Sequence, residues 1–179
     1  MRIRLVAVIV LLNLLAAVAT TMTLATALTP TAPFQLSLKW QRCPTWYCET
    51  GWYASPAVVD VDGDGQVEAL WGGYTLMSVN GSSGSIEWNR PKDSSSRLWP
   101  GIVVADLDHN GSLEVVTASG NGIISVYNAS GIPVTGWPVN PTGSGNEIRS
   151  LAVADIDNNS DLEIVMCSTR SDNQWFVYE

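Results

Sequence analysis

Residues 57–70, AVVDVDGDGQVEAL, occur in three versions along the chain. Residues 103–116 read VVADLDHNGSLEVV and residues 152–165 read AVADIDNNSDLEIV. Each version has a short apolar run, acidic residues at alternate positions, and a glutamate that leads into a second apolar run. Successive versions begin about 45–50 residues apart, a period that indicates a repeat architecture.

The polar part of each version has the chemistry of a calcium loop. Calcium prefers six to eight oxygen ligands in a small sphere, and a tight turn supplies them from alternate side chains. In a nine-residue loop the ligands are side chains 1, 3 and 5, the carbonyl of position 7 and the carboxylate of position 9. The predicted ligands are Asp60, Asp62, Asp64, the Gln66 carbonyl and Glu68; Asp106, Asp108, Asn110, the Ser112 carbonyl and Glu114; and Asp155, Asp157, Asn159, the Asp161 carbonyl and Glu163.

Position 6 of each loop needs a residue that tolerates a left-handed backbone. Gly65 and Gly111 satisfy this requirement, whereas Ser160 has a side chain that makes the conformation costly. The third site is therefore expected to be the weakest. The alternative is a set of solvated Asp and Asn turns in hairpins, but three copies in register favour calcium. An EF-hand is excluded because its closing glutamate stands at position 12 between helices.

The pattern D-x-D-x-[DN]-G-x-x-E between apolar strands resembles the FG-GAP (VCBS-like) repeat of integrin-alpha-type β-propellers. The resemblance covers residues 35–179. It implies an all-β fold of four-stranded antiparallel propeller blades, with calcium in the hairpin between the first two strands of each blade. It identifies neither a ligand nor an activity.

The remaining parts of each repeat also align. Residues 78–90 (SVNGSSGSIEWNR) and 125–138 (SVYNASGIPVTGWP) predict strand, turn and strand, and residues 37–42 (SLKWQR) match 85–90 (SIEWNR). We therefore expect one outer strand at residues 36–41, two full blades, and three strands of a third that ends at residues 175–178. Trp40, Trp88 and Trp137 recur at one blade position and are predicted to pack between blades.

About three blades are too few for a closed propeller, which usually has ~4–8. The sequence therefore predicts an open or partial propeller in which residues 36–41 do not pair with residues 175–178. Further blades would come from a longer chain, which we expect, or from another copy of this chain. In the isolated segment two exposed strand edges would promote association.

The N-terminal region reads as a targeting segment. Arg2 and Arg4 precede the apolar residues 5–19 and the small-residue site at residues 25–27, which is typical of a secretory signal peptide over residues 1–27. An uncleaved membrane anchor is the alternative. Residues 28–34 form a Pro/Thr-rich linker, and residues 35–179 form the repeat module.

The composition limits the classes of molecule that are expected as partners. The formal net charge is −8, and most acidic residues lie inside the three loops, so nucleic acid is not an expected partner. Cys43 and Cys48 are close together in an exported chain and predict a disulfide. Cys167 aligns with Gly72 and Ala118, and we interpret it as a small buried strand residue.

Catalytic chemistry is weakly represented. The sole histidine, His109, stands at loop position 4 and is predicted to be an exposed turn residue. We therefore expect a secreted or cell-surface calcium-binding module that binds a protein or carbohydrate ligand without catalysis. The alternative is the propeller portion of an extracellular enzyme, such as a polysaccharide lyase or a quinone-dependent dehydrogenase.

Overall fold

The computed structural model describes residues 35–43, 48–49, 54–91, 96–141, 143, 146–169 and 174–179. The chain divides into two units, Met1–Ser37 and Leu38–Glu179, and every strand in the described part belongs to the second. The described residues form strands and no helices, so none of them belongs to a helix able to cross a membrane. The predicted signal peptide and linker, residues 1–34, lie outside the described residues, and the module boundaries stay predictions.

Sheet 1 is a complete four-stranded blade. It contains β1 (Ala57–Val59), β2 (Glu68–Gly72), β3 (Thr75–Asn80) and β4 (Ile86–Pro91), paired antiparallel in sequence order. Burial alternates along β2, because successive side chains of a strand point to opposite faces of the sheet. The sheet confirms the predicted blade topology.

Sheet 2 has three regular strands and an irregular fourth segment. Its strands are β5 (Val103–Ala105), β6 (Glu114–Ala118) and β7 (Ile124–Asn128). The predicted fourth strand is reduced to isolated bridges that join Pro133 to Tyr127 and Val139 to Ile124. Pro133 and Pro138 have no N–H to donate to a sheet, which corrects the expectation of a full second blade.

Sheet 3 comprises β8 (Glu147–Ala154), β9 (Glu163–Thr169) and β10 (Trp175–Tyr178), in the order β10-β9-β8. Strand β10 pairs with β9 and with no other described strand. Residues 35–43 form no strand, contrary to the expectation for residues 36–41. An extended segment without a neighbouring sheet edge lacks the ladder hydrogen bonds that define a strand.

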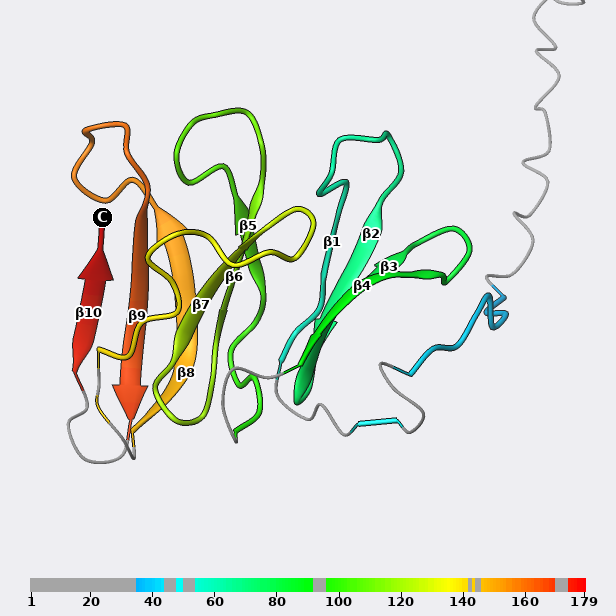
Figure 1. Ribbon diagram of the computed structural model, residues 1–179, viewed down its shortest axis with the longest axis horizontal. Helices are drawn as coiled ribbons and strands as arrows, with labels where there is room; N and C mark the ends of the chain where they lie inside the picture. Colours follow the sequence, from blue (N-terminus) through cyan, green and yellow to red (C-terminus); the bar gives the residue numbers. More distant parts are fainter. Residues whose placement is uncertain are drawn as a thin grey trace, which may run out of the picture. The chain divides into compact units, whose positions relative to one another are not determined.

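The three sheets lie in a row (Figure 1), and a hydrophobic core joins each sheet to the next. The core between sheets 1 and 2 includes Leu70, Leu76, Val115 and Tyr127. The core between sheets 2 and 3 includes the buried residues Val116, Ala118, Ile124, Val126, Ile148, Ile164 and Met166. Among the described strands, contacts link sheet 1 to sheet 2 and sheet 2 to sheet 3, but not sheet 1 to sheet 3. The propeller is therefore open, as predicted.

Tryptophan contacts reinforce the first interface. The indole N–H of Trp88 in β4 donates to the Ala129 carbonyl at 2.8 Å, and Arg90 donates to the Gly131 carbonyl. A Cβ on Gly131 would lie 2.7 Å from the Trp88 ring, so the indole lies directly on the glycine. Each of the two hydrogen bonds joins residues 41 positions apart. We call this pair of contacts the forward clasp.

The same clasp occurs at the start of the module. The indole N–H of Trp40 donates to the Gly81 carbonyl at 3.0 Å, and Arg42 donates to the Gly84 carbonyl. A Cβ on Gly84 would again lie 2.7 Å from the indole ring. Residues 38–42 thus contact sheet 1 in the way that β4 contacts sheet 2.

Trp137 makes a different contact. Its ring meets the Tyr178 ring edge-on, with centroids 6.0 Å apart. Trp88 and Trp137 therefore contact the next sheet along the chain, as predicted, whereas Trp40 contacts sheet 1 from a segment that forms no strand.

The predicted disulfide between Cys43 and Cys48 is present. Immediately after it, the Glu49 carboxylate accepts hydrogen bonds from the backbone N–H groups of Tyr74 and Thr75, at 2.8 and 2.7 Å. The carboxylate therefore caps the turn between β2 and β3 and holds the disulfide loop on sheet 1.

Candidate metal-binding loops

Three loops lie at the same end of the row of sheets, each between the first two strands of its sheet (Figure 1). They are loop 1 (residues 60–68), loop 2 (residues 106–114) and loop 3 (residues 155–163). The position-1 aspartate organises each turn. In loop 1 the two Asp60 carboxylate oxygens accept hydrogen bonds from the N–H groups of Gly63 and Gly65, at 2.8 and 2.9 Å.

Loops 2 and 3 repeat this arrangement. Asp106 accepts from the N–H groups of Asn110 and Gly111, and Asp155 accepts from those of Asn159 and Ser160, at 2.9–3.2 Å. These bonds wrap the backbone around a carboxylate, so the side chains of positions 1 and 3 converge.

Positions 1, 3 and 9 form an acidic cluster in every loop. Each residue offers a carboxylate oxygen, and the three oxygens of a cluster lie within 4.8 Å of one another. The clusters are Asp60, Asp62 and Glu68; Asp106, Asp108 and Glu114; and Asp155, Asp157 and Glu163. Three carboxylates at this separation repel one another unless a cation lies between them.

The position-9 glutamates provide an independent test of whether a cation fits. Glu68 is 0% exposed, and its Oε2 accepts the Val61 N–H at 2.9 Å while its Oε1 is buried without a hydrogen-bond partner. Glu163 also has a buried, unpartnered Oε1, and its Oε2 accepts the Ile156 N–H at 2.8 Å. A buried carboxylate oxygen without a partner is costly. A bound cation would satisfy it.

Burial also disfavours the charged form of two of these glutamates. Desolvation raises the pKa of Glu68, against the lowering effect of the Val61 N–H, and the charges of Glu87, Asp62 and Asp64 raise it further. Desolvation likewise raises the pKa of Glu114, opposed by the Leu107 N–H and reinforced by the neighbouring aspartates. A divalent ion would reverse this preference by favouring the ionised carboxylates.

The predicted ligands at position 5 accept hydrogen bonds inside their own loops. The Asp64 carboxylate is outside the first cluster and accepts the Gln66 N–H at 2.7 Å. The side-chain oxygens of Asn110 and Asn159 accept the N–H groups of Ser112 and Asp161 in the same way, each at 2.7 Å. The structure therefore brings together positions 1, 3 and 9, whereas coordination by positions 5 and 7 stays a prediction.

The backbone confirms the left-handed conformation at position 6. The φ angles of Gly65, Gly111 and Ser160 are 87°, 86° and 82°. Position 4 is left-handed as well, with φ of 56° at His109 and 63° at Asn158. This second left-handed position was not predicted, although Gly63 at position 4 of loop 1 indicates it.

His109 links two loops. Its Nε2 lies 2.6 Å from the carbonyl oxygen of Ser160 in loop 3. The side chain is exposed, as predicted, but the contact with the neighbouring loop could not be read from its position in the turn.

An all-β row of antiparallel sheets, each with an acidic hairpin loop at the same end, defines a repeat protein built from propeller-type blades. Residues 106–166, which contain loop 2 and loop 3, match the family model of the FG-GAP-like repeat. Over this segment the chain is similar to the FG-GAP-like repeat. No curated protein matches the chain.

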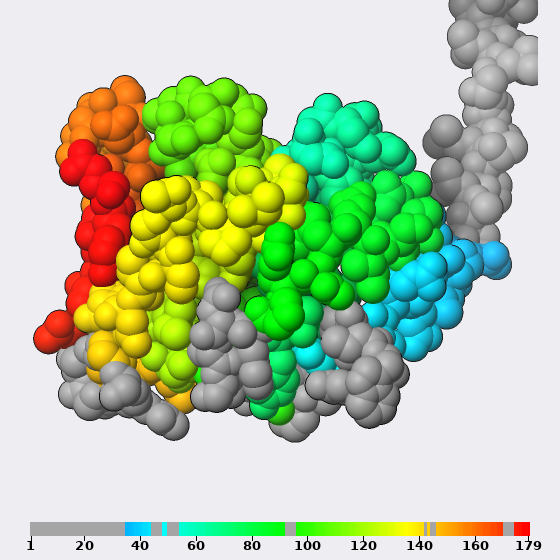
Figure 2. Space-filling model, viewed as in Figure 1, coloured from blue at the N-terminus to red at the C-terminus, as the bar shows by residue number. Residues whose placement is uncertain are grey.

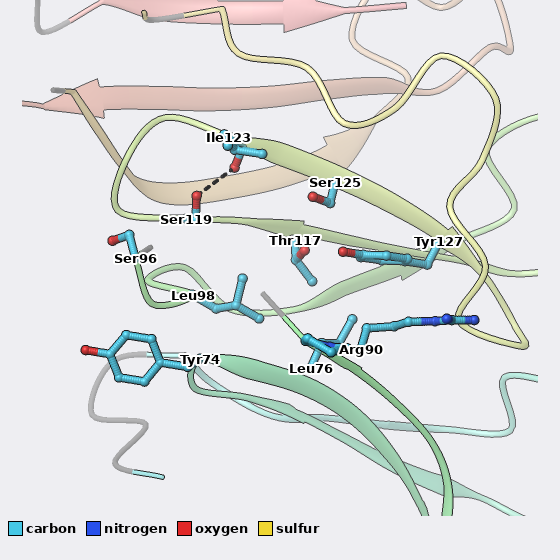
Figure 3. A pocket seen from close by; sticks show the side chains of 11 residues that line it. Tyr74, Leu76, Arg90, Ser96, Leu98, Thr117, Ser119, Ile123, Ser125 and Tyr127 are labelled. Atoms are coloured by element: carbon cyan, nitrogen blue, oxygen red, sulfur yellow. Dashed lines mark hydrogen bonds between the residues drawn. The ribbon is translucent and has the colours of Figure 1, made fainter. Parts of the chain in front are cut away.

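Two cavities border the sheet interfaces. One of about 20 Å³, between sheets 1 and 2, is lined by Leu76, Leu98, Thr117 and Ser119 among others (Figure 3), and has room for about one water molecule. Ser119 lies at its wall and donates to the Ile123 carbonyl at 3.3 Å. A second cavity, of about 190 Å³, lies between Trp137 and Tyr178 at the third sheet.

Proposed function

We propose that this chain is an extracellular, calcium-binding propeller module that presents a surface to a protein or carbohydrate ligand. The observation that carries the calcium assignment is the pair of buried glutamates Glu68 and Glu163, because each has an unpartnered carboxylate oxygen and each belongs to a cluster of three carboxylates. Oxygen-only donor sets of this kind suit calcium better than zinc or copper.

Calcium would act structurally. Positions 1, 3 and 9 would hold the ion, which would neutralise the carboxylates and fix the hairpin between the first two strands of each blade. The glutamates already accept the N–H of loop position 2, so the outer end of each blade is ordered around the same side chain that would bind the metal.

Two features support an extracellular location. A Cys43–Cys48 disulfide persists most readily in an oxidising compartment. Calcium is also present there near 1 mM, which suits modules with dissociation constants of about 10⁻⁴–10⁻³ M.

The end opposite the loops is the proposed ligand surface. Arg97 lies over the Tyr74 ring, 4.9 Å from its centroid, and Arg149 lies over the Trp99 ring at 4.1 Å. Arg149 already pairs with Glu147 at 2.5 Å, so these half-exposed aromatic and basic groups would act by stacking on a sugar ring. The aromatic residues Trp46, Tyr47, Trp52 and Tyr53, which the sequence places near the disulfide, lie outside the described residues.

The calcium assignment is tested by isothermal titration of the metal-free full chain with calcium. We expect about three ions per chain at dissociation constants of about 0.1–1 mM, and progressively fewer ions in the single, double and triple variants of Glu68→Gln, Glu114→Gln and Glu163→Gln. Magnesium should bind more weakly, since it demands near-octahedral geometry. An unchanged calcium isotherm in the triple variant would contradict the proposal.

A further inference from the structure

The two interfaces between the sheets share one pattern. We call the face of a sheet that packs on the next sheet its forward face, and the opposite face its backward face. Two residues lie at the centre of each forward face. One follows the loop glutamate by two positions in the second strand of the sheet, and the other is its pairing partner in the third strand. These pairs are Leu70 with Ser78, Val116 with Val126, and Val165 with Val177.

Sheet 3 leaves its forward face uncovered. The pairs in sheets 1 and 2 are buried, with no residue more than 1% exposed. In sheet 3 Val177 is 51% exposed, and Trp175 on the same face is 74% exposed. Cys167, which was expected to be buried, is only half-buried for the same reason. Strand β10 lies at the margin of the row, and no described strand pairs with its outer edge (Figure 2).

Sheet 1 leaves part of its backward face uncovered, and this is the kind of face on which a forward face packs inside the molecule. Val58 pairs with Ala69 on this face and is 67% exposed. The corresponding residues of sheets 2 and 3, Val104 and Val153, pack against the inter-sheet cores. The two ends of the row therefore expose the two halves of an interface that occurs twice inside the molecule.

Residues 38–42 belong to none of the three sheets. They make the forward clasp onto sheet 1 through Trp40 and Arg42, as β4 makes it onto sheet 2 through Trp88 and Arg90. Strand β4 is the fourth strand of its sheet. Residues 38–42 thus take the position of a fourth strand belonging to a sheet that would precede sheet 1.

We propose that the forward face of sheet 3 docks on the backward face of sheet 1 in a second copy of this chain, whose residues 38–42 pair with β10. Trp88 lies opposite Ser78 in sheet 1, so Trp40 of the second copy lies opposite Val177. One chain carries both the uncovered forward face and the uncovered backward face, so a second copy of the chain can cover the forward face of sheet 3. Two copies joined in this way give six sheets, within the usual ~4–8 of closed propellers.

The first experiment measures the mass of the full chain in calcium by light scattering. We expect a species of twice the 19.3 kDa chain mass. Val177→Lys would bury an ammonium group in the interface and raise the dissociation constant about a hundredfold, whereas Val177→Ile should keep the dimer. Because Val177 is half-exposed in the single chain, the Lys variant should retain its melting curve when dilute. A monomeric wild type, or association that is indifferent to Val177→Lys, would overturn the proposal.

The second experiment tests the register. In sheet 1 the hydroxyl of Ser78 donates to the Glu87 carboxylate at 2.8 Å, so these two side chains are in contact. In the proposed junction Val177 takes the position of Ser78, and Lys39 of the second copy takes the position of Glu87. Mixing Lys39→Cys with Val177→Cys, both in a Cys167→Ser background, should give a disulfide between the two chains. Ile132→Cys, also exposed, is the control in place of Val177→Cys. Equal cross-linking of both mixtures would exclude this register.

Discussion

At the residue scale, the buried loop glutamates combine a structural and a metal-binding role. One carboxylate oxygen of Glu68 accepts the Val61 N–H of loop 1, the other is buried without a partner, and the carboxylate clusters with Asp60 and Asp62. Substitution by glutamine preserves the acceptor for the Val61 N–H and removes the charge, so the two roles can be separated.

Glu68→Gln should leave the metal-free protein as stable as wild type or more stable, because it removes a buried carboxylate whose pKa is raised by burial. It should lower the calcium-induced stabilisation by about 1.4 kcal/mol, the value for one site with a dissociation constant near 0.1 mM in 1 mM calcium. Melting curves with calcium and with EDTA measure both effects. Glu49→Gln, which removes an acid at the turn between β2 and β3 and keeps an acceptor for the Tyr74 and Thr75 N–H groups, is the control and should keep the full calcium response.

Ser160 carries the strain of loop 3. Its φ of 82° is a conformation that glycine adopts freely, so Ser160→Gly should stabilise the protein by up to about 1 kcal/mol. Ser130→Gly, at a turn position outside the left-handed set, should instead destabilise slightly. Chemical denaturation of both variants gives the comparison. A loss of more than about 1 kcal/mol in Ser160→Gly would contradict the strain interpretation.

At the element scale, the forward clasp depends on glycine for space as well as for conformation. Gly131 has a φ of 71° and lies under the Trp88 ring, whereas Gly136 has a φ of 95° and nothing near its missing Cβ. Gly131→Ala should therefore destabilise by about 1–3 kcal/mol more than Gly136→Ala, since only the first also overpacks the interface. Denaturant titrations of the two variants test this difference.

The hairpin loops and the blade topology could be predicted because local chemistry dictates them. Alternating aspartates, the residue at position 6 and the apolar flanks each act within a dozen residues. The fourth strand of sheet 2 was predicted wrongly, because Pro133 and Pro138 remove donors that the alignment with β4 suggested were present. The His109 contact with Ser160 joins residues 51 apart, and no local pattern reports it.

At the scale of the whole molecule, stability should depend on calcium and pH together. The pKa values of Glu68 and Glu114 are raised above 4.5 by burial, so in metal-free protein their stabilising contribution is present at low pH and is lost as the pH rises through the raised values. Calcium requires the ionised forms. The calcium-induced rise in melting temperature should therefore be larger near pH 7.5 than near pH 5.

Calorimetry at the two pH values, with calcium and with EDTA, measures that difference. Three sites at about 1.4 kcal/mol each correspond to roughly 10 °C at neutral pH. A calcium response that is the same at both pH values would contradict the role of these carboxylates.

The forward clasp also has a consequence for synthesis on the ribosome. Trp88 finds its acceptor 41 residues later in the chain, and translation proceeds at about 5–20 residues per second. Each new blade therefore waits about 2–8 s before the next one emerges to cover its forward face. During that interval an apolar sheet face is open to chaperones or to a neighbouring nascent chain, which makes the order of emergence part of how the row of blades is assembled.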